Sequence, residues 1–276
     1  MEIVHVSDLH YADGDPFQIA LIDALFKDLE QQLKSGLSPE VLVFSGDLVN
    51  NPDDEDIYAS FEERLLKPLL ATLELSSDQV IFCPGNHDLS FAAIKDRAML
   101  YDSLQTNGKK PELLAEQCRK EELPEYARAI SKDFFKLCSR YGGAWSNPFW
   151  HVYDFPASNL AFVVLNSAFS CSLKVSPEDH GKLVYPVDQA LAAFQSVMKG
   201  RYVLSVAHHP ITDFTEATSR ALMPIVEKRT GVHFSGTCTS RNRPRRRAQS
   251  ATASWFSLER STRRRTVNTT ATRSSA

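Results

Sequence analysis

The chain has 276 residues, a formal net charge of −3 and 43% hydrophobic residues, which suits one large domain with a full core. No apolar run approaches the length of a membrane-spanning helix, so we expect no membrane insertion. The N-terminus enters a strand-like run without a preceding basic segment, and the five cysteines are scattered and odd in number. These features predict a cytoplasmic protein with reduced thiols.

Strands and helices are predicted to alternate over the first 83 residues. Apolar residues recur at helical spacing between residues 16 and 34, and short apolar runs end just before Asp8 and Gly46. The expected order is a strand over 1–6, a helix over 16–34, a strand over 41–45, a helix over 57–73 and a strand over 80–83. This alternation predicts an α/β fold in which helices cover the faces of a sheet.

Residues 91–141 interrupt the alternation with a long, polar and helix-rich insertion. It is either a cap or extra subdomain above a site, or a solvated elaboration unrelated to substrate. The aromatic segment 144–156 is expected to pack beside the sheet. The alternation then resumes with a strand over 160–165, a helix over 187–198, a strand over 202–207, a helix over 215–228 and a strand from 232.

Four of the predicted strands end at polar residues that can bind a metal ion. The motifs are, in chain order, Asp8-Leu9-His10, Gly46-Asp47, Gly85-Asn86-His87-Asp88 and His208-His209-Pro210. The carboxyl ends of strands in an open α/β sheet meet at the edge where sites assemble. Carboxylate, amide and imidazole groups at that edge suit a pair of divalent metals bridged by one carboxylate.

The ordered motifs resemble those of the calcineurin-like metallophosphoesterase family over roughly residues 1–234. The resemblance implies a layered fold, with two sheets flanked by helices. It also implies hydrolysis of a phosphomonoester or phosphodiester by a hydroxide that two divalent metals activate. The metals would be Mn, Fe, Zn or Co, and the partner would be the phosphate-ester substrate.

The resemblance also implies a role for each metal ligand. Asp8 and His10 resemble the ligands of the first metal, and Asp47 resembles the bridging carboxylate. Asn86 and His208 resemble a neutral oxygen ligand and an imidazole ligand of the second metal. All five are expected to converge on one edge of the fold.

Four further residues are candidates for catalysis or substrate binding. His87 lies beside a metal-ligating Asn and is the candidate acid for the leaving oxygen, and Asp88 is expected to orient it. His209 is expected to touch substrate, and Asn166 either faces the substrate or caps a turn. The remaining histidines are interpreted as hydrogen-bonded structural residues: His5, His151, His180 and His233.

Residues 235–276 differ in composition from the rest of the chain. They hold ten arginines, one glutamate and no lysine or aspartate, so they carry about +9 and the remainder about −12. This Arg-, Ser- and Thr-rich composition predicts disorder and places the domain boundary after residue 234. The basic run Arg241–Arg247 lacks interleaved aromatic residues, so we consider nucleic acid only as a candidate substrate.

The family pattern ends with a Gly-His-x-His motif, which should follow Phe234 but does not. The chain instead reads Ser235-Gly236-Thr237-Cys238-Thr239-Ser240. These residues can be encoded by codons whose neighbouring frame spells Gly-His-Met-His-Glu, which suggests a frame shift just before Ser235 and a truncated domain. The alternative is a genuine basic tail on a divergent enzyme.

The missing motif bears directly on function. Each metal would lose one imidazole ligand, so we expect impaired metal binding and hydrolysis in this chain. A catalytically dead pseudo-phosphoesterase that acts as a binding module is therefore the second function class.

Overall fold

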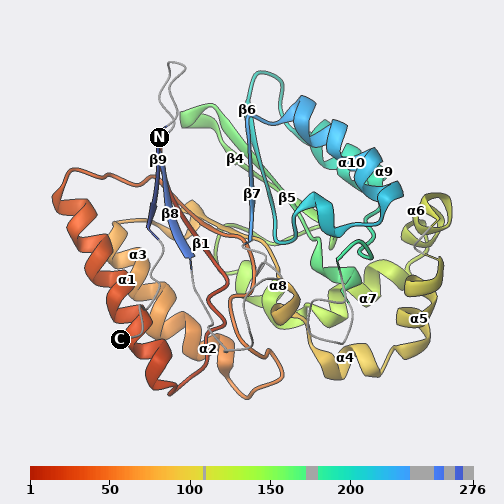
Figure 1. Cartoon of the computed structure of the whole chain (residues 1–276), viewed down its shortest axis with the longest axis horizontal. Helices are drawn as coiled ribbons and strands as arrows, with labels where there is room; N and C mark the ends of the chain where they lie inside the picture. The colour runs from red at the N-terminus through yellow and green to blue at the C-terminus, as the bar shows by residue number, and fades with distance from the viewer. Residues whose placement is uncertain (108–109, 172–179, 237–251, 258–264, 270–276) are drawn as a thin grey trace.

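The computed structural model describes residues 1–107, 110–171, 180–236, 252–257 and 265–269 (Figure 1). The described residues form two β-sheets that lie between two layers of helices, as the layered α/β prediction requires. The fold predicted from the family resemblance is thus confirmed.

The first sheet carries three of the four predicted motifs. Its strands are β1 Glu2–Ser7, β2 Val41–Phe44, β3 Val80–Phe82, β8 Thr252–Ser257 and β9 Arg265–Thr269. They are ordered β3-β2-β1-β8-β9, with β1, β2 and β3 parallel and β8 antiparallel to β1. The parallel arrangement brings the carboxyl ends of β1, β2 and β3 to one edge.

The second sheet carries the fourth motif. Its strands are β4 Trp150–Phe155, β5 Leu160–Leu165, β6 Tyr202–Ala207 and β7 Val232–Ser235, in that order. The strands β5, β6 and β7 are parallel, and β4 is antiparallel to β5. The aromatic segment expected beside the sheet is therefore partly an edge strand of it, since aromatic residues favour a pleated, half-buried surface.

Helices cover the outer face of each sheet (Figure 1). Those of the first layer are α1 Pro16–Lys34, α2 Ile57–Phe61 and α3 Lys67–Leu73, with the π-helical segment η1 Glu62–Leu66 joining α2 to α3. Those of the second layer are α9 Val187–Ser196 and α10 Glu216–Arg229. The helix α1 begins where predicted because Pro16 is its first residue and the Asp15 side chain accepts a bond from the Phe17 N–H.

The insertion over residues 91–141 is helical, as predicted. It comprises α4 Phe91–Lys95, α5 Ala98–Asn107, α6 Pro111–Arg119, α7 Glu122–Ile130 and α8 Lys132–Cys138. Short 3-10 turns elsewhere are η2 Ser77–Gln79, η3 Asn86–Asp88, η4 Pro156–Ser158, η5 Ala168–Ser170 and η6 Ile211–Asp213. Buried residues of α7 join a cluster with Phe149 and Phe169 on the outer side of the second sheet, whereas Phe134, Leu137 and Cys138 of α8 join the cluster between the sheets.

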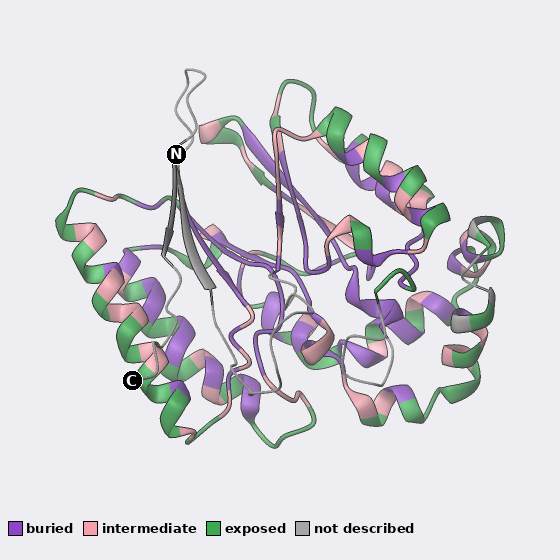
Figure 2. Ribbon diagram, viewed as in Figure 1, coloured by how far each residue is buried: buried purple, intermediate pink, exposed green. Residues whose placement is uncertain are grey.

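Side chains alternate between two hydrophobic clusters along the second sheet. Phe162 and Val164 of β5 pack between the sheets, whereas Val163 and Leu165 pack on the outer side with residues of α9. This is the period-two alternation of a strand buried on both faces. The strands β1, β2, β3 and β5 are accordingly buried along almost their whole length, and the outward faces of the helices are exposed (Figure 2).

Two segments of the C-terminal tail form strands, β8 and β9, that cover the free edge of β1. They contain Thr, Trp, Phe and Val, residue types that favour strands. The expectation of disorder for 237–251, 258–264 and 270–276 falls outside the described residues. Among the described helices, none is both long and apolar enough to cross a membrane.

Candidate metal centre

Three of the predicted metal ligands lie on strained backbone. Asp8, His10 and Asp47 have φ angles of 55°, 47° and 54°, in the left-handed region that residues other than glycine rarely adopt. The Asp8 N–H donates to the Gly46 carbonyl at 3.1 Å, and the His10 N–H donates to the Asp47 carbonyl at 2.9 Å. These bonds continue the pairing of β1 with β2 beyond the strands and hold both ligand loops together.

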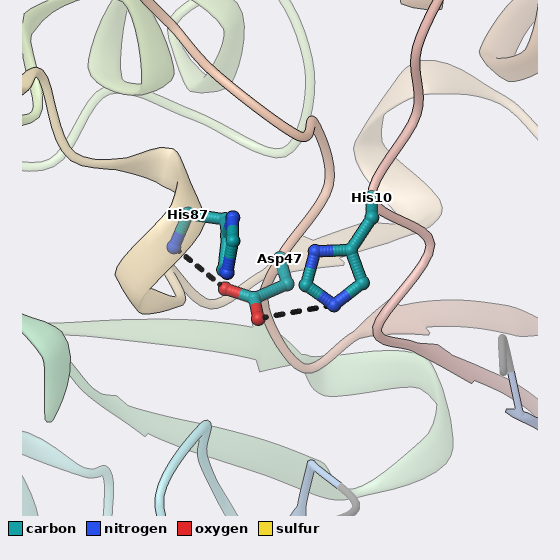
Figure 3. A group of neighbouring side chains, drawn as sticks. All are labelled: His10, Asp47 and His87. Atoms are coloured by element: carbon teal, nitrogen blue, oxygen red, sulfur yellow. Dashed lines mark hydrogen bonds and ion pairs between the residues drawn. The ribbon is translucent and has the colours of Figure 1, made fainter. Parts of the chain in front are cut away.

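Two groups of candidate ligands share Asp47. Asp8, Asp47 and His208 each offer a ligand atom within 4.8 Å of the others, and so do His10, Asp47 and His87. Asp47 Oδ2 lies 3.6 Å from His10 Nε2 (Figure 3) and 3.4 Å from His208 Nε2. A carboxylate common to both groups is the arrangement that a bridging ligand requires.

The grouping differs from the predicted one in two respects. His208 joins Asp8 rather than a separate second set, and His87, the candidate acid, lies with His10 and Asp47. The rings of His10 and His87 meet edge to face with centroids 4.4 Å apart. The sequence could not give this partition because it depends on how the loops after β1, β3 and β6 approach each other in space.

Electrostatics at the centre follow from burial and proximity. Burial opposes the charge on Asp47, yet the surrounding imidazoles of His208, His10 and His87 lower the pKa of its carboxyl well below the ordinary value. Burial also opposes a charge on the His10 imidazole, and it therefore lowers the pKa of His10. Burial acts in the same direction on His208, but the adjacent Asp47 carboxylate raises its pKa to about 10. The Asp47 carboxylate thus favours a positive charge beside it.

The buried ring nitrogens fit a divalent metal. His208 Nδ1 is 2.8 Å from the carbonyl of Ser45, so an N–H at Nδ1 leaves Nε2 to face Asp47. His10 Nδ1 is buried without a hydrogen-bond partner. An unpaired buried nitrogen is costly, and carboxylate and imidazole donors together suit manganese, iron, zinc or cobalt.

His87 is tied to the loop after β2 at two points. Its backbone N–H donates to Asp47 Oδ1 at 2.8 Å, and its ring Nδ1 lies 2.9 Å from the Asn50 carbonyl. Asn86 begins the same 3-10 turn, η3, and is partly buried. This turn therefore places Asn86 next to the residue that contacts the shared carboxylate.

Asp88 has different partners from the predicted one. Its buried carboxylate accepts bonds from the N–H groups of Leu48 and Val49 at 3.1 and 3.4 Å and from Gly85 at 2.9 Å. The Tyr58 hydroxyl donates a further bond at 3.1 Å. Asp88 therefore fastens the loops after β2 and β3 to each other, while the Asn50 carbonyl orients the His87 ring. Burial and the nearby Asp47 raise the pKa of Asp88 to about 6.

The two predicted substrate-binding residues lie outside the two ligand groups. Both ring nitrogens of buried His209 have partners, Ser167 Oγ at 3.0 Å and Cys171 Sγ at 3.5 Å. Burial lowers the pKa of His209 to about 3. Asn166 donates to the Pro148 carbonyl and accepts bonds from two backbone N–H groups of the following turn. These bonds correspond to the second alternative given for Asn166, in which its side chain caps a turn.

The histidines interpreted as structural also lie outside the two ligand groups. Their contacts are His5 with Ser45 Oγ at 2.7 Å, His233 with Ser205 Oγ at 2.7 Å, His180 with Asp213 at 2.6 Å, and His151 stacked on Trp145. Burial lowers the pKa of His5, His151 and His233 to about 4.

Three glycines allow the loops to approach the centre closely. A Cβ at Gly85 would lie 2.1 Å from Asp47 Oδ1, and one at Gly46 would lie 2.4 Å from His208 Nδ1. A Cβ at Gly236 would lie 2.7 Å from the same nitrogen. Close contacts with Asp47 and His208 thus explain why glycine, rather than a residue with a Cβ, stands in the Gly-Asp and Gly-Asn-His-Asp motifs. The position of each glycine beside a candidate ligand is the sequence signal that could have predicted these contacts.

Comparison with known proteins agrees with this geometry. A cAMP/cGMP dual specificity phosphodiesterase of Mycobacterium tuberculosis (strain CDC 1551 / Oshkosh) is 33% identical over 91 residues. That stretch covers 31% of this chain and 26%, about a quarter, of the length of that protein. The sequence model of calcineurin-like phosphoesterases matches residues 1–236. The chain therefore belongs to the calcineurin-like phosphoesterase family.

Proposed function

We propose that this domain is built to hydrolyse a phosphomonoester or phosphodiester at a centre of two divalent metals, and that the missing Gly-His-x-His motif impairs this activity in the present chain. The observation that carries the proposal is the position of Asp47 in both ligand groups. One metal would be held by Asp8, Asp47 and His208, and the other by His10 and Asp47 together with Asn86. When bound, such ions supply Lewis-acid stabilisation of phosphoryl charge and lower the pKa of water.

The protein groups have separate tasks in this proposal. Asp47 presents two oxygens: Oδ2 faces His10 and His208, while Oδ1 accepts the His87 N–H. His87, fixed through Nδ1 by the Asn50 carbonyl, can carry a proton on Nε2 and donate it to the departing ester oxygen. Asp88 keeps the two loops that carry these groups in register.

The substrate proposal stays at the level of the phosphate ester. The curated relative acts on cyclic nucleotides, which are phosphodiesters, and this supports testing a diester first. The residues before 235 carry about −12, which opposes binding of a long nucleic-acid track that would need many lysines and arginines.

The test is a metal-dependent assay with Asp47 as the decisive residue. In a protein in which Gly-His-Met-His follows Phe234, we expect hydrolysis of bis-(p-nitrophenyl) phosphate or p-nitrophenyl phosphate with Mn²⁺, loss of activity with a chelator, and recovery on adding Mn²⁺. Asp47→Ala should lose both turnover and Mn²⁺ binding because it removes the ligand common to both groups. Asp23→Ala, an exposed change on α1, is the matched control. Full activity of Asp47→Ala would refute the proposal.

A second candidate function rests on residues 235–240, which contain no histidine where the family motif has two. In that case residues 1–234 form a truncated, catalytically dead domain that binds a partner, and 235–276 are an out-of-frame tail. Mn²⁺ binding without turnover of any phosphate ester would favour this function over hydrolysis.

A further inference from the structure

We propose that Gln18, a buried glutamine in the first turn of α1, positions the Asp8-Leu9-His10 loop. Its side-chain Nε2 donates to the carbonyl oxygens of Leu9 and His10, both at 3.1 Å. Gln18 is 1% exposed, whereas glutamine usually lies at the surface. Both N–H groups of this buried amide therefore serve one loop that carries two candidate ligands.

The geometry of these two bonds favours one backbone conformation at His10. The carbonyls of Leu9 and His10 belong to the peptide groups on either side of the His10 Cα. In an extended strand, successive carbonyls point to opposite sides, so one nitrogen could not reach both. The left-handed φ of 47° at His10 brings them together, and Gln18 favours this folded conformation over the extended one.

The loop is held by two separate parts of the fold. Its N–H groups bond to the loop after β2, through the His10 N–H to the Asp47 carbonyl at 2.9 Å. Its carbonyls bond to Gln18 on α1. Strained backbone persists only where the surroundings fix it from several directions, and buried carbonyls that lose a donor favour another conformation. Gln18 supplies the second direction.

The first test needs no metal. Gln18→Met keeps the length and unbranched shape of the side chain but removes both donors, and Gln18→Glu keeps the shape with an acceptor in their place. We expect amide hydrogen exchange over residues 7–11, followed by mass spectrometry, to become about 10-fold faster in both variants. Peptides from α3 and β5 should keep their protection, which separates a local effect from general unfolding. Gln31→Met, an exposed position on the same helix, is the matched control.

The second test measures Mn²⁺ binding by calorimetry, and this part rests on the proposed function. Partners that orient metal ligands typically change metal affinity 10- to 100-fold, so we expect a loss of about that size in Gln18→Met and none in Gln31→Met. If the protein binds no Mn²⁺ even with Gly-His-Met-His after Phe234, the proposed function fails while the exchange experiment still decides the role of Gln18. Unchanged exchange over residues 7–11 would overturn the positioning role, and faster exchange with unchanged Mn²⁺ affinity would overturn its link to the metal centre.

Discussion

His87 is held by two independent bonds, and only one of them involves its side chain. The backbone N–H binds Asp47 Oδ1, and ring Nδ1 pairs with the Asn50 carbonyl. A ring fixed through Nδ1 presents Nε2 in one direction, which suits either a proton donor or a metal ligand. The two roles make different predictions for a variant that loses the ring and keeps the backbone.

In the protein in which Gly-His-Met-His follows Phe234, we predict that His87→Ala lowers turnover about 100-fold at saturating Mn²⁺ while leaving the amount of bound metal unchanged. Alanine retains the N–H that contacts Asp47, so the shared carboxylate keeps this bond. The measurements are steady-state kinetics and the metal content of the purified variant. Loss of metal with an unchanged rate per bound ion would instead make His87 a ligand.

Histidines kept neutral by full or partial burial make stability depend on pH. Burial lowers the pKa of His5 and His233 from 6.5 to about 4 in the folded protein. Below pH 6.5 the unfolded chain takes up protons at these rings and the folded protein does not. Their contribution to the free energy of unfolding is therefore complete above pH 6.5 and falls between pH 6.5 and 4, by up to about 1.4 kcal/mol per pH unit for each ring.

We predict that His233→Leu makes the free energy of unfolding depend less steeply on pH, by the equivalent of about one proton taken up on unfolding. The measurement is urea unfolding at several pH values between 4.5 and 7. Asp88 titrates in part of the same range with the opposite sign, because its raised pKa of about 6 lets the folded protein bind a proton there. The contribution of Asp88 is the same in the unmodified and the variant protein, so it cancels when the two are compared. An unchanged slope would show that His233 is protonated in the folded state.

At the scale of elements, the centre depends on a close approach between the loop after β2 and the loop after β3. Gly85 precedes the 3-10 turn η3 and lies against the backbone and side chain of Asp47. Its φ of −104° is open to any residue, so its requirement for glycine is purely steric. The loops after β2 and β3 can meet only where one of them lacks a Cβ.

We predict that Gly85→Ala lowers the free energy of unfolding by about 2 kcal/mol and weakens Mn²⁺ binding, because its methyl group must displace Asp47. Thermal unfolding should show a midpoint about 4 to 8 °C lower. Gly200→Ala, whose new Cβ meets nothing within 4 Å, should leave Mn²⁺ affinity unchanged. Equal Mn²⁺ affinity in both variants would contradict the close-contact argument.

Regular elements were the most predictable part of this fold. The helix α1 and the strands β5 and β6 have the predicted bounds because apolar periodicity or a continuous apolar run marks them locally. The π-helical segment η1 was not predicted, since its residues fit an ordinary helix pattern equally well.

The candidate site was less predictable because its details rest on distant pairs. The motifs indicated which loops converge, and Asp8, His10, Asp47 and His208 do lie together. Two of the partners of Asp88, the N–H groups of Leu48 and Val49, are 40 and 39 positions away along the chain, and no local pattern reveals them. The same holds for His209, whose burial against Ser167 depends on how β5 and β6 pair.

At the scale of the whole molecule, the segment after Phe234 decides between the two functions. We predict little or no hydrolysis by the chain as it stands, because residues 235–240 offer no imidazole, and activity once Gly-His-Met-His follows Phe234. The assay is hydrolysis of bis-(p-nitrophenyl) phosphate with Mn²⁺ for both proteins. Equal activity would refute the frame-shift hypothesis and make the tail a functional segment.

The bond between Ser45 and His208 joins residues 163 positions apart, one directly after β2 of the first sheet and the other directly after β6 of the second. On a growing chain, β1 and β2 leave the ribosome long before β6, and contacts of such sequence separation close slowly. During synthesis, the carboxylates of Asp8 and Asp47 are therefore present before the imidazole of His208 can join them. The centre is completed late in synthesis, and a nascent chain stalled before His208 would lack one complete ligand group.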